Sequence, residues 1–352
     1  MRPLDPQRFE GQVGGRPVGL YTLRSHQMQA SWCNQGARLL QLLVPDRQGQ
    51  MRDVVLGHDS LEQLLKGMSS MGAFVGRYAN RIARSRLVID GQTHRLPAND
   101  GPHCLHGGPG GSRHQVFEVR ACSGDRLSLG WTFLSRDDGF PGDVDLQLDC
   151  QIEGATLTLN YRAEVSGAAT ALNFTSHPFF NLDGDASDSA LDHELQIDAD
   201  QFVPVSADRI PLGHFEPVAG TAFDFRQPRV VRQALAQGHP QLGPKLGFDH
   251  AYVTPVAAGG LRRQARLRSA LSGIVMEVWS DAPSLQFFSS AAMDGSGPRH
   301  AGKHGRVHGS GAGLCLEPQH LPDAPNQPGF GPWLYRPGQC LRGQIQYRFS
   351  LA

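Results

Sequence analysis

The sequence has no excess of charge of either sign, because 33 Lys and Arg residues balance 33 Asp and Glu residues. A nucleic-acid footprint or a polybasic membrane contact needs clustered positive charge, so neither partner is expected. The chain also lacks long apolar runs, and residues 1–10 lack the apolar core of a secretion signal. We therefore expect a cytoplasmic protein that binds neither nucleic acid nor membranes.

Cysteine is scarce as well, with six residues in 352 and no C-x-x-C spacing. Closely spaced cysteines are typical of zinc sites and disulfide-rich domains, so we expect reduced thiols. His103 and His106 are three residues apart, but no H-E-x-x-H motif or thiolate pair completes a ligand set. The sequence thus predicts no metal site.

Helical patterns are few. Asp59–Glu62 resembles a capping box that begins a short helix, and residues 230–237 could form two more turns. Most other segments alternate between apolar and polar residues, which predicts a hairpin across 144–165 with one buried face. Shorter strands are predicted at 39–44, 86–89, 127–134, 274–279, 285–289 and 345–349.

Together these segments predict an all-β, sandwich-like protein, with 42 Gly and 24 Pro residues to separate the short strands. No linker or charge run divides residues 1–352, so a single domain is expected. The glycine-rich segment 292–313 carries His300, His304 and His308 at spacing four, but its glycines oppose a helix. We expect a mobile surface loop there.

The segment from Leu314 to Phe330 places one carboxylate, Glu317, between an apolar run and a proline-rich stretch. Proline fixes φ and removes a backbone donor, so we expect the strand to end at Glu317 and a stiff loop to follow. A carboxylate held in this way suits a general base. The alternative is an ordinary surface glutamate at a turn.

Four further clusters combine polar groups with aromatic rings: 76–83, 102–108, 176–182 and 247–253. Packed histidines and surface ion pairs would explain each cluster alone. Taken together, their mixed donors and acceptors suit a polyhydroxylated sugar ring. No serine nucleophile elbow and no second carboxylate partner for Glu317 is evident, which disfavours acyl transfer and glycoside hydrolysis.

These motifs, in this order, resemble the aldose 1-epimerase (galactose mutarotase) family: Gly76-Arg-x-Ala-Asn-Arg-Ile82, Leu105-His-Gly-Gly108, His177-x-Phe-Phe-Asn-Leu182, Phe248-Asp-His250 and Leu316-Glu-x-Gln319 with Pro322–Pro328. The resemblance implies a large antiparallel β-sandwich of the galactose-mutarotase type with few short helices. It implies an isomerase that interconverts the α and β anomers of free aldohexoses such as glucose and galactose. It also implies a small-molecule sugar partner and no cofactor; no oligomeric state is predicted.

By this resemblance, Glu317 is the general base, His177 is the acid that protonates the ring oxygen, and His106 is a second histidine near that oxygen. The residues implied to hold the sugar are Asn80, Arg81, Asp249, Gln286 and Phe179. Two positions depart from the family pattern, since Ser176 stands where Asn is common and Phe179 where Tyr is common.

Ring opening needs one group to take a proton and another to give one. We expect an ionised Glu317, and a His177 kept charged by a neighbouring carboxylate, with side-chain tips roughly 5–8 Å apart. A hexose-6-phosphate 1-epimerase is an alternative that would need cations at the rim, for which Arg77, Arg113 and Arg299 are candidates. The other alternative is a non-catalytic sugar-binding module.

Overall fold

Strands dominate the chain, as the alternating pattern predicts, and paired strands run antiparallel in every sheet. The structure is a computed structural model that describes residues 3–352 except 69, 245–246 and 256–259. Within those ranges, no helix combines the length and apolar character needed to cross a membrane.

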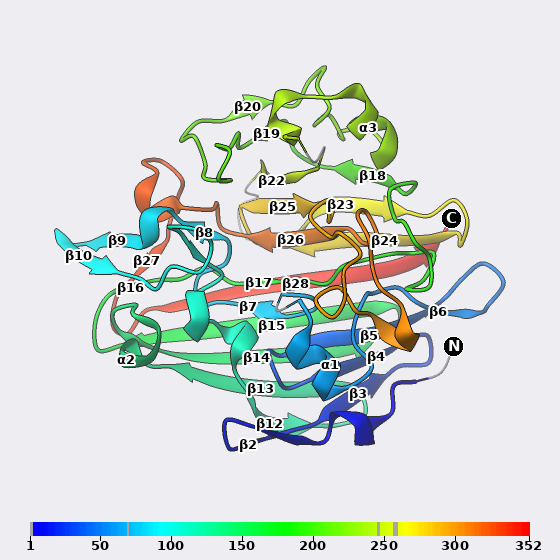
Figure 1. Ribbon diagram of the computed structural model, residues 1–352, viewed down its shortest axis with the longest axis horizontal. Helices are drawn as coiled ribbons and strands as arrows, with labels where there is room; N and C mark the ends of the chain where they lie inside the picture. The colour runs from blue at the N-terminus through cyan, green and yellow to red at the C-terminus, as the bar shows by residue number, and fades with distance from the viewer. Residues whose placement is uncertain (1–2, 69, 245–246, 256–259) are drawn as a thin grey trace.

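The largest sheet has nine strands and forms the back layer in Figure 1. In spatial order its strands are β12 (Glu118–Cys122), β13 (Arg126–Phe133), β14 (Asp143–Glu153), β15 (Thr156–Ser166), β28 (Cys340–Leu351), β24 (Ile274–Ser280), β23 (Arg262–Arg268), β18 (Glu194–Ile197) and β21 (Arg229–Val230). The predicted hairpin across 144–165 is confirmed as β14 and β15, which pair along their whole length.

Two smaller sheets lie in front of it. One has five strands, β20 (Glu216–Pro217), β19 (Gln201–Phe202), β22 (Asp249–Val253), β25 (Ser284–Phe288) and β26 (Cys315–Gln319). The other has four, β3 (Leu20–Arg24), β4 (Gln29–Cys33), β5 (Arg38–Pro45) and β6 (Met51–Asp53).

Five two-stranded ribbons complete the described strands. They pair β1 (Gly11–Val13) with β2 (Arg16–Val18), β9 (Arg86–Ile89) with β10 (Gln92–Arg95), β8 (Arg81–Ile82) with β11 (Cys104–Leu105), β16 (Thr170–Ala171) with β27 (Leu334–Tyr335), and β7 (Phe74–Val75) with β17 (Thr175–Ser176). The ribbon β7–β17 lies between the two smaller sheets in Figure 1, and β17 contacts β26.

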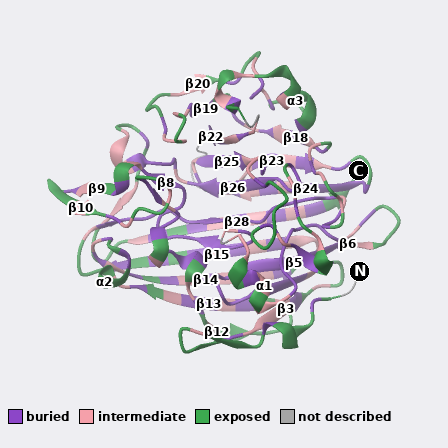
Figure 2. Cartoon of the chain, viewed as in Figure 1, coloured by how far each residue is buried: buried purple, intermediate pink, exposed green. Residues whose placement is uncertain are grey.

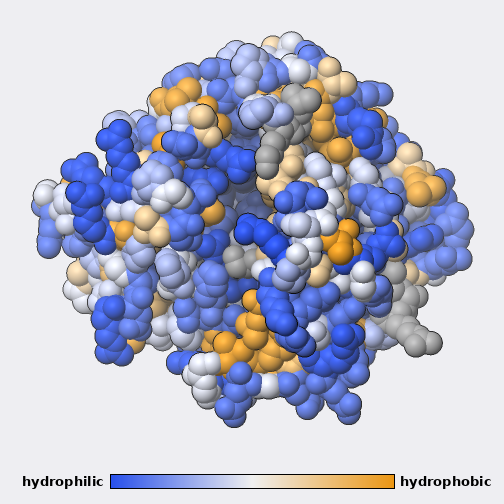
Figure 3. Space-filling view, viewed as in Figure 1, coloured by the Kyte–Doolittle hydropathy of each residue, from blue (hydrophilic) through white to orange (hydrophobic). Residues whose placement is uncertain are grey.

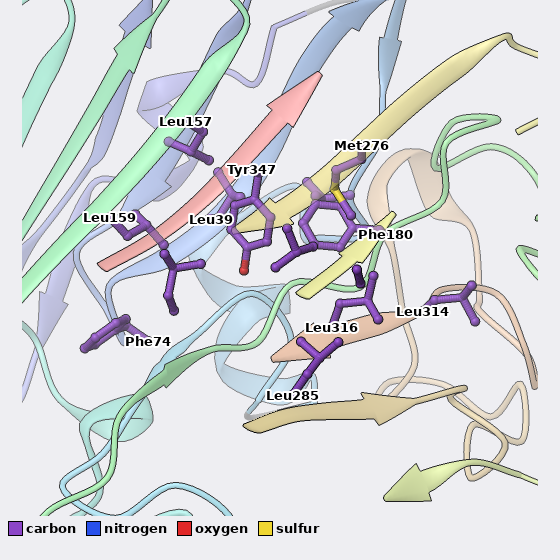
Figure 4. Close-up of a cluster of buried hydrophobic side chains, with 14 of the residues drawn as sticks. Leu39, Phe74, Leu157, Leu159, Phe180, Met276, Leu285, Leu314, Leu316 and Tyr347 are labelled. Carbon is purple, nitrogen blue, oxygen red and sulfur yellow. The ribbon is translucent and has the colours of Figure 1, made fainter. Parts of the chain in front are cut away.

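The main core fills the space between the front and back layers (Figure 2). Figure 4 shows Leu285 and Leu316, from β25 and β26, near Phe180 and Tyr347 of this core. Burial alternates along β14 because its apolar residues face inward and its polar residues face outward. The all-β sandwich expected from the sequence is therefore confirmed.

Helices are few and short. α1 (Leu61–Lys66) begins one residue later than the capping-box pattern indicates, because the Ser60 side chain accepts the bond from the Gln63 N–H. α3 (Val231–Gln237) matches the predicted turns at 230–237 to within one residue. The third, α2 (Ser135–Asp138), is a single turn that the sequence pattern did not indicate.

The expectation of a surface loop at 292–313 holds only in part: residues 294–299 are exposed, and a single 3₁₀ turn at Lys303–Gly305 is the segment's one helical element. His300, Lys303 and His308 are all buried. The Lys303 ammonium donates to the Asp53 carboxylate at 2.6 Å and to two backbone carbonyls, and Asp185 lies 3.5 Å away. The glycine-rich composition does not reveal this burial, because the Lys303–Asp53 ion pair that anchors the segment joins residues far apart in the chain.

Candidate active site

Glu317 lies in the middle of strand β26, not at its end, and is 2% exposed. β26 is the last strand of the five-stranded sheet and pairs only with β25 there, so Pro318 sits opposite Leu285 without losing a central ladder bond. The expectation that the strand ends at Glu317 is therefore wrong, because β26 continues to Gln319. The alternative of a surface glutamate at a turn is also excluded, because the side chain is buried.

His177 follows β17 and faces Glu317, with 3.5 Å between His177 Nε2 and Glu317 Oε1. The backbone of His177 is fixed on both sides, since its N–H donates to Ala73 and its carbonyl accepts from Gly72. Its ring stacks on Phe179 at 5.2 Å. The two side chains are closer than the 5–8 Å expected for groups flanking a sugar, and they form a direct pair.

His106 stands beside this pair, with its ring edge-on to His177 at 5.5 Å. Its Nδ1 accepts the N–H of Asn80 at 3.1 Å, so in the neutral ring the proton is on Nε2, which is left as a donor. The residue after His106 has to be glycine. Gly107 adopts φ +75°, and a Cβ at this position would lie 2.5 Å from the Gly76 carbonyl oxygen.

The ribbon β8–β11 brings Asn80 and Arg81 to the same place. The Asn80 Oδ1 accepts a hydrogen bond from the N–H of Arg81 at 2.9 Å. The amide NH₂ of Asn80 takes no part in that bond and can donate to a ligand. The Arg81 Nε donates to Asp100 at 2.8 Å. Both residues are nearly buried, at 5% and 7% exposure, so their orientation is fixed before any ligand binds.

Asp249 and Gln286 lie on the adjoining strands β22 and β25. The Gln286 Nε2 donates to Asp249 at 2.8 Å, while the buried Gln286 Oε1 has no partner among the described residues. Gln286 also sits directly opposite Glu317 in the ladder. A buried acceptor without a donor is costly, so a hydroxyl ligand would satisfy it.

Phe179 packs against the His177 ring. Its side chain is fully buried, in a cluster with Leu56, Met293 and Cys315, and it lies behind the His177 ring. It therefore packs against the histidine ring, and its expected role as a sugar contact remains a prediction. The missing hydroxyl relative to tyrosine is consistent with this apolar setting.

The structure also brings in residues that the sequence did not indicate. Arg209 follows a tight turn and places its Nε 3.3 Å from Asp249 Oδ2. It lines two hollows, one of about 530 Å³ beside Asp249 and one of about 250 Å³ beside Arg81. No local pattern marks this arginine, because its role depends on a contact between distant segments. Figure 3 shows this face of the molecule hollowed near its centre, over β25 and β26.

Two of the three arginines considered as rim cations are committed elsewhere. Arg77 is fully buried, and its Nε lies 2.7 Å from Asp138. Arg113 is also buried, and it donates to the carbonyl of Leu105, the residue before His106. Arg113 therefore helps to hold the backbone that precedes His106.

Burial controls the protonation of the Glu317–His177 pair. It raises the pKa of Glu317 well above the ordinary value, and the charge of Asp249 adds to this shift. Burial lowers the pKa of His177 to about 4, although Asp249 acts in the opposite direction. Burial and then the positive charge of Arg113 lower the pKa of His106. The expectation that a nearby carboxylate keeps His177 charged is wrong, because desolvation outweighs attraction.

One group of side chains near the centre has donors that could hold a metal ion. His177, Cys315 and Glu317 offer nitrogen, sulfur and oxygen atoms within 4.8 Å of one another, and all three are buried. The spacing rules applied to the sequence did not indicate this group, because His177 is far from the other two along the chain. The expectation that no metal is required remains a prediction.

Known proteins were compared with the chain as a whole. The family model described as aldose 1-epimerase matches residues 19–348. The galactose mutarotase of Rattus norvegicus is 38% identical, and the match covers 96% of both chains. The aldose 1-epimerase of Escherichia coli is 33% identical and covers 95% of this chain and 96% of its own.

Solved structures give the same result. A GalM/aldose epimerase homologue from C. elegans superposes with a TM-score of 0.86 at 30% identity, covering 95% of this chain and 99% of its own. A galactose 1-epimerase from Lactobacillus acidophilus superposes with a TM-score of 0.82 at 25% identity, covering 97% of both.

Proposed function

This chain belongs to the aldose 1-epimerase family, and we propose that it interconverts the α and β anomers of free aldohexoses such as glucose and galactose through Glu317 and His177. It is an isomerase, a mutarotase that acts on a small-molecule sugar. The observation that carries the assignment of roles is the 3.5 Å contact between a buried carboxylate and a buried imidazole.

In the forward half-reaction Glu317 takes the proton of the anomeric hydroxyl. The C1–O5 bond breaks as the carbonyl forms at C1, and His177 gives its proton to O5. After rotation about the C1–C2 bond, the O5 hydroxyl attacks the other face of the aldehyde. Its proton returns to His177 while Glu317 protonates the new anomeric oxygen, so the net proton count is unchanged and no cofactor is needed.

The pKa shifts place the shared proton of the resting pair on Glu317, so ring opening starts from the minor form that has the proton on His177. A carboxylate with a raised pKa is a stronger base, and an imidazolium with a lowered pKa is a stronger acid, so the protons move downhill during ring opening. The product state has a neutral acid and a neutral imidazole beside the open-chain sugar. Burial favours this uncharged state over the ion pair that precedes it.

The neighbouring groups are proposed to hold the sugar. His106, through Nε2, and the amide of Asn80 are donors, while Asp249 and Gln286 Oε1 are acceptors. Arg81 adds a charge-assisted donor. A pyranose presents hydroxyls that donate and accept, and this mixture matches them.

The two alternatives have less support. Arg77, one of the cations considered for a 6-phosphate, is paired with Asp138 below the surface. A non-catalytic sugar-binding module would not need a buried acid and base in contact, because such a pair is costly unless it serves chemistry. Family membership and this pair together favour the unphosphorylated sugar.

We also propose that residues 1–352 form one domain and that the protein is cytoplasmic. The domain proposal is supported by a match that spans residues 19–348 without a break and by strand β28, which joins the last segment of the chain to the middle of the large sheet. The location is supported by the six cysteines, which are all free thiols in the structure.

Glu317→Gln tests the assignment. The amide keeps the shape of the side chain but cannot take the anomeric proton, so mutarotation should fall by about 10²–10⁴-fold. The measurement is the decay of optical rotation of freshly dissolved α-glucose, with calorimetric titration to show that the sugar still binds. His177→Asn should behave alike.

Glu62→Gln is the matched control, because Glu62 is exposed on α1 and pairs only with Lys66 among the described residues. It should retain full activity. A folded Glu317→Gln protein with more than half the normal activity would overturn the assignment of Glu317 as the base.

A further inference from the structure

Strand β26 presents a thiol and the catalytic carboxylate on the same side. Alternate residues of a strand point to the same face, so Cys315 and Glu317 share the face opposite Leu316, which lies in the core. β17 contacts β26 and carries His177 to this face. An imidazole, a thiol and a carboxylate therefore converge from two segments that are distant in sequence.

The three donor atoms lie within 4.8 Å of one another. Zinc binds such ligands at about 2.0–2.3 Å in a tetrahedron, which places neighbouring donors about 3.3–3.6 Å apart. His177 Nε2 and Glu317 Oε1, at 3.5 Å, already meet this requirement. The thiol of Cys315 lies within 4.8 Å of both atoms, so it needs to approach them by at most about 1 Å to join the set.

The carboxylate of Glu317 has no direct ion pair with a lysine or arginine among the described residues. No Lys or Arg side chain in the described part of the chain lies within 4.0 Å of the Glu317 carboxylate, whose ion-pair partner there is His177. His177 and Glu317 retain 6% and 2% exposure, whereas the thiol of Cys315 is fully buried. A nitrogen, sulfur and oxygen set with one open position is the type of site that zinc and cobalt occupy in proteins.

We propose that His177, Cys315 and Glu317 form a binding site for a thiophilic divalent cation such as Zn²⁺, which inhibits the enzyme by competing with the sugar. The ion occupies the two groups that would otherwise exchange protons with O1 and O5, so metal and sugar exclude each other. The inhibition rests on the proposed function, whereas the binding of the metal does not.

Cobalt spectroscopy tests the site without reference to activity. One equivalent of CoCl₂ added to the chelator-treated protein should give a near-ultraviolet thiolate-to-cobalt charge-transfer band and visible bands of four-coordinate intensity, and ZnCl₂ should abolish both. Cys315→Ser should remove the charge-transfer band. Cys150→Ser, at a buried cysteine of β14 away from the site, is the matched control and should keep it.

Glu317→Gln provides a second test if Cys315→Ser does not fold, because loss of one ligand should weaken cobalt binding by at least about 10–100-fold.

In kinetics, ZnCl₂ should raise the apparent KM for glucose and leave kcat unchanged, with full recovery after EDTA. Absence of the charge-transfer band, or a band that survives in Cys315→Ser, would overturn the site. A fall in kcat at constant KM would overturn the competition. A protein without mutarotase activity that still shows the cobalt spectrum would contradict the proposed function alone.

Discussion

At the scale of single residues, the site is built from side chains that have one polar atom fixed by the protein and another left for a ligand. His106 accepts a backbone N–H at Nδ1 and keeps Nε2. Gln286 donates to Asp249 and keeps an unpartnered Oε1. Fixing one atom removes rotational freedom, so the second atom is oriented before the sugar arrives and less entropy is lost on binding.

The pH profile of kcat/KM should reflect the reversed order of the two catalytic pKa values. The pair carries one proton between the lower pKa, about 4 for His177, and the raised pKa of Glu317. Below the lower value both groups are protonated and no base remains, and above the higher value both are deprotonated and no acid remains. Initial-rate polarimetry over pH should therefore give a bell with its acid limb near 4. A profile limited on the acid side by Glu317 and on the alkaline side by His177 would show that the order is not reversed.

Arg81→Ala should weaken sugar binding by about 1.5–3 kcal/mol, because it removes a charge-assisted donor. The loss should appear in KM and in the calorimetric Kd more than in kcat, since Arg81 transfers no proton in the proposed mechanism. Arg81→Lys is the conservative control. It should recover only part of the affinity, because lysine keeps the positive charge but lacks the paired N–H donors of the guanidinium group. Unchanged kcat/KM for several aldoses in Arg81→Ala would count against this role.

At the scale of elements, an edge strand and an anchored segment position the base. β26 tolerates Pro318 because it pairs on one side only. A proline-rich sequence can therefore carry the buried Glu317, the proposed base. Directly before β26, the segment 292–313 packs Met293 and Ala312 against Phe179 and Cys315. The same segment is held to the rest of the molecule by the buried Lys303.

Lys303→Met should lower the free energy of unfolding by about 3–5 kcal/mol, because it leaves the carboxylates of Asp53 and Asp185 buried without their cation. Urea unfolding followed by circular dichroism measures the change. Lys66→Met is the matched control, since Lys66 is exposed and its pair with Glu62 is worth little, so the change should stay within about 0.5 kcal/mol.

A second variant separates a lost cation from lost packing. Lys303→Met combined with Asp53→Asn should regain part of the stability, because one of the uncompensated charges is removed. Equal stability of Lys303→Met and Lys66→Met would show that the buried pair does not anchor the segment.

At the scale of the whole molecule, the large sheet is assembled from segments that are far apart in the chain. β28 lies between β15 and β24 and pairs with both along most of its length. Its inward residues Leu341, Ile345 and Tyr347 are buried in the main core. The C-terminal segment is therefore a central strand of the sheet.

Removal of residues 340–352 should abolish cooperative unfolding, because β15 and β24 lose their shared neighbour and a row of core side chains. Thermal unfolding followed by circular dichroism, together with soluble yield, measures the effect. Removal of Ala352 alone is the control and should change little, because this residue is exposed and outside β28. A soluble, cooperatively unfolding 1–339 chain would refute the central role of β28.

Much of the fold could be predicted from local patterns. The alternation of Val144, Leu146 and Leu148 specified which face of β14 is buried, because side chains of a strand alternate strictly. Alternation says nothing about which strands become neighbours, so the position of β28 in the sheet was not predictable. The burial of His300, Lys303 and His308 was missed for the same reason, since Lys303 meets Asp53 across 250 positions.

The sequence by itself determined the strand periodicity and, through five ordered motifs, the family and the chemical types of the site residues, because both are properties of residue identity and spacing. Only the tertiary structure decided that Glu317 lies within a strand, that His177 contacts it directly, and that Cys315 and Arg209 join the site. It also decided the order of the catalytic pKa values. The physical reason is that desolvation depends on everything packed around a group, which no local segment of the sequence contains.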